Sequence, residues 1–321
     1  DLNLGPALFT EKALYGDVTY HFTPRFDVLL GARYTHDWTQ YTQTGDGLLV
    51  GPSHFTTTGT DSPTTYLINP KFKIDDNVML YGRIASGFRP GGPNVGVPPG
   101  LGAPITFGPD NLVNYEVGLK TTLLQRRMTF DIDAFYIDWS HIQLTSNIAG
   151  IGFLSNGGKA KSQGIEAAWT LRPVAGLTLT ANASWTDAVL TQNTPAGLVG
   201  FTGDRLPYVP RWNANVGAEY VFPLADGWSG YAGGNYGYTG SRITDFQSVP
   251  DARYHLPSFE VLDLHAGLNH GAWTFGTFVK NATNARGIMI LSFETTNPTA
   301  SPYSATYILP REIGVTASVD F

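Results

Sequence analysis

The stretch RWNANVGAEYVF, residues 211–222, decides the fold because its side chains alternate between polar and apolar up to Tyr220. One face carries Trp212, Ala214, Val216, Ala218, Tyr220 and Phe222, and the other carries Arg211, Asn213, Asn215, Gly217 and Glu219. Successive side chains of a β-strand point to opposite faces. The period of two therefore predicts a strand with one apolar and one polar surface.

The same alternation recurs along the whole chain, and short turns alternate with long loops between the segments. We predict about thirteen strands, over 12–23, 26–40, 63–74, 77–88, 112–123, 127–144, 160–172, 177–188, 210–222, 227–240, 258–269, 272–282 and 310–321. The long loops cover 41–62, 89–111, 145–159, 189–209, 241–257 and 283–309. No sustained 3.6-residue period predicts a long helix. This order is typical of an all-β, antiparallel up-and-down transmembrane barrel with short periplasmic turns and long outer loops.

Composition supports a chain that faces lipid. Only 14% of the residues are charged and 13% are aromatic, whereas a soluble domain has about 25% charged residues. Aromatic residues near the long-loop ends of the strands are Trp38, Trp139, Trp185, Trp212 and Tyr238, and those near the short turns are Phe26, Phe222, Trp228, Trp273 and Phe321. Two such girdles flank the apolar band of a membrane barrel. A soluble β-sandwich used for adhesion is the alternative interpretation.

Several classes of function find no support in the sequence. The net charge of −6 argues against a nucleic-acid partner. With no cysteine and no paired-histidine spacing among its 7 histidines, the chain predicts no metal site. The nucleophile elbow, the zinc-protease motif, the phosphate-binding loop and the dinucleotide-binding glycines are all missing, so we expect no enzyme.

The end of the chain, REIGVTASVDF, alternates up to its last residue. Val319 and Phe321 fall on the apolar face, which predicts a closing strand whose terminal aromatic ring serves as an assembly signal. An odd number of strands cannot close an up-and-down barrel, because its first and last strands must run antiparallel. Either residues 1–11 hold one more strand, or the chain is the C-terminal part of a larger barrel, which a first residue other than Met favours.

Six stretches carry a family resemblance: VMLYGRIASGFRPGGPN (78–94), NYEVGLK (114–120), NGGKAKSQGIEAAW (156–169), LPYVPRWNANVGAEY (206–220), FVKNATNARG (278–287) and LPREIGVTASVDF (309–321). In order and spacing they resemble the C-terminal β-barrel of TonB-dependent outer-membrane receptors of the siderophore-receptor type. The resemblance implies a barrel of about 22 strands with a plugged lumen, of which residues 1–321 form the last thirteen strands as one barrel domain. The sequence shows neither a plug domain nor a TonB box.

The same resemblance implies energised uptake of a scarce ligand in the outer membrane of a Gram-negative bacterium. The partners it implies are outer-membrane lipid, the TonB–ExbB–ExbD complex acting through the missing plug region, the barrel-assembly machinery and a ferric siderophore. The chain itself would hold no cofactor. Pro90 follows Arg89 directly, unlike the pattern of haem receptors, which favours a ferric chelate as the ligand, with haem, cobalamin and glycans as the alternatives. A passive porin-like channel is the alternative.

Two groups of residues are candidates for the site. The predicted ligand-binding residues are Arg89, Arg242, Asp245, Phe246, Arg253, Tyr254 and His255, where cations and rings suit a catecholate or hydroxamate complex. The alternatives without a binding role are that the turn at Arg89 only packs the loop base, and that the loop 241–257 is an ordinary solvated loop. The predicted residues facing the lumen or plug are Arg83, Glu116, Lys120, Asp131, Asp133, Glu166, Arg211, Glu219 and Asp263, with simple solvation of the lumen as the alternative.

Overall fold

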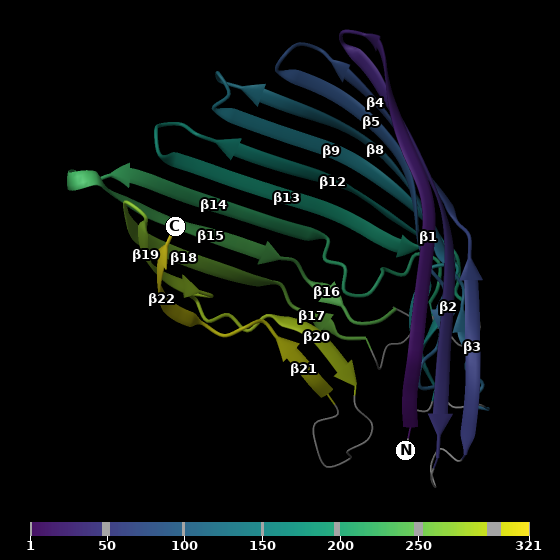
Figure 1. Cartoon of the computed structure of the whole chain (residues 1–321). Coiled ribbons are helices and arrows are strands. Elements are labelled where there is room, and N and C mark those ends of the chain that lie inside the picture. Colours follow the sequence, from purple (N-terminus) through teal and green to yellow (C-terminus); the bar gives the residue numbers. More distant parts are fainter. Residues whose placement is uncertain are drawn as a thin grey trace.

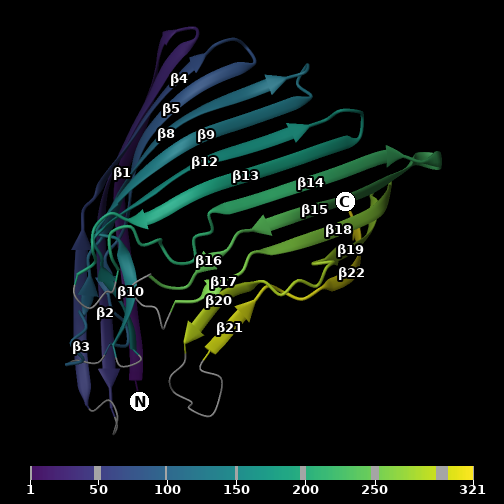
Figure 2. The same cartoon turned by 180° about the vertical axis from the view of Figure 1, so that it is seen from behind.

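The computed structural model of the chain describes residues 2–46, 52–97, 100–148, 151–195, 200–246, 253–293 and 303–320. Its main element is one antiparallel sheet whose thirteen-strand path follows chain order. The strands are β1 (Leu2–Thr23), β2 (Phe26–Gly45), β4 (Thr64–Lys73), β5 (Val78–Arg89), β8 (Asp110–Leu123), β9 (Met128–Ser140), β12 (Lys159–Leu171), β13 (Leu177–Leu190), β14 (Trp212–Pro223), β15 (Trp228–Thr239), β18 (Phe259–His270), β19 (Trp273–Lys280) and β22 (Glu312–Val319). Figures 1 and 2 show this sheet curving from β1 at one border to β22 at the other.

All thirteen predicted strands are confirmed, but the proposed extra strand in residues 1–11 is wrong. Residues 2–11 lengthen β1, which pairs with β2 up to Leu2 opposite Gly45. The predicted strand 127–144 is also too long, because β9 ends at Ser140 and His141 adopts a positive φ of 56°. The chain turns there into a separate hairpin.

Short turns gather at one end of the sheet and long connections at the other (Figure 1). At the β1–β2 turn, the Thr23 hydroxyl accepts hydrogen bonds from the backbone N–H groups of Arg25 (3.2 Å) and Phe26 (3.0 Å). Between β14 and β15 the chain makes a 3₁₀ turn, η1 (Ala225–Gly227), where Gly227 has φ +76°. Local side-chain bonds and glycine conformations therefore set the hairpin registers.

The prediction that the long connections are plain loops is wrong in part. β3 (Ser53–Asp61) pairs with the end of β2, and four small hairpins fold elsewhere in these connections. They are β6 (Gly92–Pro93) with β7 (Thr106–Phe107), β10 (Gln143–Ile148) with β11 (Ile151–Asn156), β16 (Arg242–Ile243) with β17 (His255–Leu256), and β20 (Ile288–Phe293) with β21 (Tyr303–Tyr307). Four of these strands, β6, β7, β16 and β17, have two residues each, which is too short for a period of two to show in the sequence.

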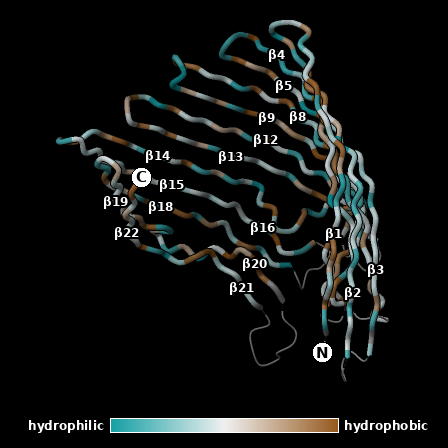
Figure 3. Tube along the Cα trace, in the orientation of Figure 1, coloured by the Kyte–Doolittle hydropathy of each residue, from teal (hydrophilic) through white to brown (hydrophobic). Residues whose placement is uncertain are grey.

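The two faces of the sheet have the predicted character. On β14, the exposed fractions of Trp212, Val216 and Tyr220 are 56%, 54% and 44%, so large apolar groups point outward from the wall. Figure 3 shows brown and teal segments succeeding one another along the strands. Such a surface suits a lipid environment rather than water. In the described ranges, no helix has the length and apolar character needed to cross a membrane.

One aromatic residue was assigned wrongly and one cannot be placed. Trp139 shares a face of β9 with Asp131 and Asp133, so it does not belong to an outward girdle. Val319 is half-buried opposite Trp273 at the end of β22. Phe321 lies outside the described residues, and its role as an assembly signal stays a prediction.

Candidate ligand and lumen site

The polar face of the sheet is the face that carries Arg83, Glu116, Asp131, Glu166 and Glu219. Strand register places its charges side by side, because directly opposite residues on neighbouring strands have Cβ atoms about 4.5–5.5 Å apart. The predicted lumen-facing residues fall on this face, and what they contact in a complete barrel stays a prediction.

A hydrogen-bonded network centres on Glu116 of β8. Its carboxylate pairs with the Arg83 guanidinium and accepts hydrogen bonds from the Tyr81 hydroxyl (2.8 Å) and the Asn114 amide (3.1 Å). Tyr81 lies flat across Gly118, where an added Cβ would come within 2.5 Å of its ring. Gly118 is therefore needed for Tyr81 to reach Glu116, which makes this network a rigid part of the wall.

Next to that network lies a more acidic hollow of about 370 Å³. Lys120 approaches Asp131 at 3.9 Å, while Asp133 on β9 stands directly opposite Glu166 on β12. Its lining includes all four of these charged residues. Three carboxylates with one ammonium group give this part of the polar face a net negative charge, which would attract cationic groups of a partner.

The remaining predicted lumen residues make separate contacts. Glu219 bonds to His265 at 2.7 Å across Gly233, where a Cβ would collide with the Glu219 carboxylate at 1.9 Å. Arg211 reaches Asp187 at 3.4 Å. Asp263 accepts the backbone N–H of Asn281 at 2.7 Å, which anchors the chain just after β19.

Arg89 is anchored at the long-loop end of β5. Its Nε donates to both oxygens of Asp110, at 3.1 and 2.9 Å, and its guanidinium lies 5.0 Å from the centre of the Trp139 ring. The Asp110 side chain is 2% exposed and also accepts the backbone N–H of Gln143 at 3.3 Å. This supports the alternative that Arg89 packs the loop base, although half of its side chain remains exposed.

We expect Asp110→Ala to loosen this loop base more than Arg89→Ala does. Removing the carboxylate leaves several donors without their acceptor, whereas a partly exposed Arg89 is readily replaced by water. A double-mutant cycle in denaturant unfolding should show a coupling of about 1–2 kcal/mol, below the value for fully buried pairs because Arg89 is half exposed. A coupling of zero would contradict the anchoring role.

The residues predicted in the loop 241–257 differ widely in accessibility. Arg242 is 5% exposed: it donates to the Ile288 carbonyl at 2.7 Å and stacks over Phe259 at 5.3 Å. Burial lowers the pKa of Arg242 and raises the pKa of Asp245, which accepts the N–H of Phe246 at 2.7 Å. Arg242, Asp245 and Phe246 hold the loop in place. Their role in ligand binding stays a prediction.

The other predicted residues of this loop are less buried than Arg242 and Phe246. His255 is exposed, whereas Arg253 and Tyr254 are half-buried. The backbone N–H of Tyr254 donates a hydrogen bond to the Thr244 hydroxyl at 2.9 Å, which links the two sides of the loop. His255 is therefore the most exposed of the predicted residues in this loop, and Arg253 keeps part of its surface exposed.

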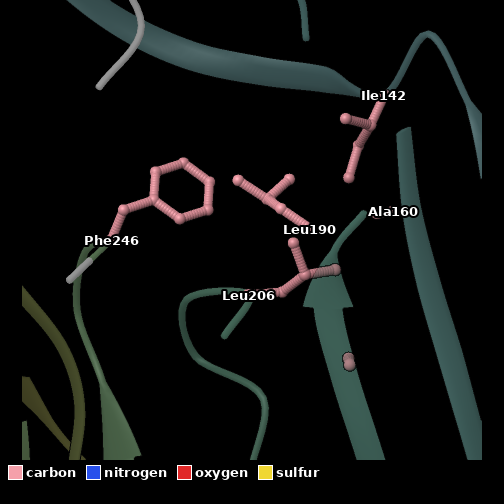
Figure 4. Close-up of a cluster of buried hydrophobic side chains, with 6 residues drawn as sticks. Ile142, Ala160, Leu190, Leu206 and Phe246 are labelled. Carbon is pink, nitrogen blue, oxygen red and sulfur yellow. The ribbon is translucent and has the colours of Figure 1, made fainter. Parts of the chain in front are cut away.

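A buried apolar cluster connects the loop bases. Sequence reasoning did not predict it, and it assigned one of its members, Phe246, to ligand binding. The cluster consists of Ile142, Ala160, Ala188, Leu190, Leu206 and Phe246. Figure 4 shows Phe246 and Ile142 on either side of Leu190. Ala160 and Leu190 lie opposite each other at the long-connection ends of β12 and β13. The cluster therefore joins loops that are far apart in the sequence and fastens them to that end of the sheet.

Comparison with known proteins gives consistent results. A family described as TonB-dependent receptor-like β-barrel matches residues 6–282. The pesticin receptor of Yersinia enterocolitica is 31% identical over 211 residues, which cover 65% of this chain and 30% of that protein. The metal-pseudopaline receptor of Pseudomonas aeruginosa is 26% identical over 273 residues, covering 83% and 36%.

Among solved structures, the ferric yersiniabactin uptake receptor of Yersinia pestis superposes with a TM-score of 0.80 at 24% identity. The match covers 98% of this chain and 46% of that receptor, and at this identity it shows the fold alone. The matches to the curated relatives named above cover only 30% and 36% of those proteins' own length.

Proposed function

Because this chain belongs to the TonB-dependent receptor β-barrel family, we propose that it forms part of an outer-membrane receptor that takes up a ferric siderophore by an energised mechanism. The observation that supports this most is the family match over residues 6–282. Relatives named for a metal–pseudopaline complex and for ferric yersiniabactin point to a metal chelate as the ligand class. Family membership also argues against the passive porin-like alternative.

In this proposal the polar face lines the lumen and meets a plug, and the long loops capture the chelate outside the membrane. The acidic hollow around Asp133 and Glu166 would face cationic groups of the plug, whereas an anionic chelate would be held farther out. The TonB–ExbB–ExbD complex would supply the energy, and the barrel-assembly machinery would insert the barrel among outer-membrane lipids.

Uptake in whole cells tests this function. We expect cells that make the protein to accumulate radioactive iron from ferric chelates in a saturable way, and to lose this uptake when TonB is deleted or the proton gradient is collapsed. Uptake that rises linearly with concentration and persists without TonB would show a passive channel instead.

The loop residues are tested in the same assay. Arg253→Ala is expected to weaken chelate binding about tenfold, the effect of losing one charge-assisted contact. The matched control is Arg25→Ala, an exposed arginine in the β1–β2 turn at the opposite end of the sheet. If both variants bind equally well, Arg253 is not part of the ligand site.

A further inference from the structure

Three carboxylates stand in register on three neighbouring strands near one border of the sheet. Glu11 on β1 lies opposite Asp37 on β2, and Asp37 lies opposite Asp61 on β3. Directly opposite like charges repel one another across a sheet. The negative charges of Glu11 and Asp61 both repel the carboxylate of Asp37. Such a row needs a neutralising partner.

Asp37 is the most isolated member of this row. Glu11 pairs with Arg33 and Asp61 accepts a backbone N–H, whereas Asp37 has neither kind of contact among the described residues. Its exposed fraction is 2%, and neither carboxylate oxygen has a hydrogen-bond partner among the residues that the structure describes. The hydroxyl of Tyr41, on the same face of β2 and also 2% exposed, lacks one as well. Buried polar atoms are almost always paired, so orphaned oxygens point to a group that binds there.

The nearby cations do not fill this role. Arg33 pairs with Glu11 through its guanidinium and donates from Nε to the Thr35 hydroxyl at 3.1 Å. His36 bonds to Ser62 at 2.9 Å through Nδ1. Both side chains attract Asp37 electrostatically, yet neither donates a hydrogen bond to it.

The segment 91–97 lies over this row of carboxylates. The backbone N–H of Gly91 donates to Asp61 at 2.9 Å, and β6, which follows it, contacts both β2 and β3. Further along, the N–H of Gly96 donates to the Gln43 side chain at 3.0 Å. The segment 91–97 is thus held against the polar face at the place where Asp37 is buried.

We propose that Asp37 and Asp61 bind one divalent cation of the calcium class beneath segment 91–97. Oxygen ligands with net negative charge and no soft donors suit a hard cation. The Glu11 carboxylate pairs with Arg33 and does not join the site. Among the described residues, no group of three acidic or histidine side chains could hold a metal ion together. The site therefore consists of two carboxylates, and water completes the coordination shell. The bound cation would tie the 89–111 loop to β2 and β3 through Asp61.

Direct binding measurements test the site on the purified protein in detergent after chelator treatment. We expect saturable binding of one Ca²⁺ per chain with a Kd of about 10⁻⁴–10⁻³ M, the range of extracellular calcium modules. Tb³⁺ should give sensitised luminescence through Trp38 or Tyr41, and Ca²⁺ should displace it. Ca²⁺ should also slow hydrogen exchange at the Gly91 amide.

Asp37→Asn should weaken this binding by roughly tenfold or more, and Asp61→Asn should do the same. The asparagine removes a repelling charge without changing the shape of the side chain, so we expect both variants to assemble. The matched control is Asp17→Asn, an exposed carboxylate on β1 that should leave binding unchanged.

Two results would overturn the proposal: no saturable Ca²⁺ binding to the wild-type protein, or undiminished binding to Asp37→Asn. The first result would mean that a proton neutralises Asp37 instead. None of these measurements uses a ferric chelate, so they are independent of the proposed uptake.

Discussion

Replacing Val216 with arginine is expected to lower the free energy of unfolding in a lipid bilayer by about 2–4 kcal/mol, the cost of an arginine on the lipid face near the midplane of a barrel. Val216 lies in the middle of β14, opposite Ala181 and Tyr236 on the neighbouring strands. Its side chain is 54% exposed on the apolar face, so the new guanidinium would have hydrocarbon around it and no partner.

The adjacent residue provides the matched control. Asn215 points to the polar face, between Asn182 and Gly237, where water and charged side chains can solvate an arginine. Asn215→Arg should therefore cost much less. The measurement is reversible denaturant unfolding in liposomes, and equal losses for the two variants would contradict the assignment of the faces.

The second large effect is expected from Leu190→Ala. Leu190 is 1% exposed and lies at the centre of the apolar cluster that joins the loop bases, between Phe246 and Ile142 (Figure 4). Deleting a buried leucine side chain costs about 2–5 kcal/mol, because apolar contacts are lost and a cavity remains. The loss of stability should affect the loops rather than the hydrogen-bonded wall, because parts of a protein can open locally without the rest unfolding.

Hydrogen exchange read out by mass spectrometry measures this effect. In Leu190→Ala, protection should fall in residues 141–148, 151–158 and 200–209, while the long strands of the wall keep theirs. The control Leu264→Ala removes a leucine that is 44% exposed on the wall and away from the cluster, so it should leave loop protection unchanged. Identical exchange in both variants would mean that the cluster does not hold the loops.

The candidate site was only partly predictable. The polar-face residues Arg83 and Glu116 could be assigned from alternation alone, because a period of two determines which side chains share a face. Arg242 and Phe246 resemble ligand contacts in the sequence, yet the structure buries both at the loop base. The partner of Arg89 was missed, because nothing local links it to Asp110, twenty-one residues further along.

The sequence by itself determined the wall of this protein. Each strand, its two faces and the short turns depend on residues a few positions apart, so thirteen strands could be located from alternation and turn residues. Only the tertiary structure decided how the long connections fold. Asn94 bonds to the backbone of Leu154, and the Tyr208 hydroxyl donates to the Leu291 carbonyl at 2.9 Å.

Those contacts join segments 60 and 83 residues apart, so no local period records them. The same holds for the row formed by Glu11, Asp37 and Asp61, which exists only because β1, β2 and β3 pair in one register. Local chemistry specifies a strand, whereas a binding site depends on which strands and loops the fold brings together.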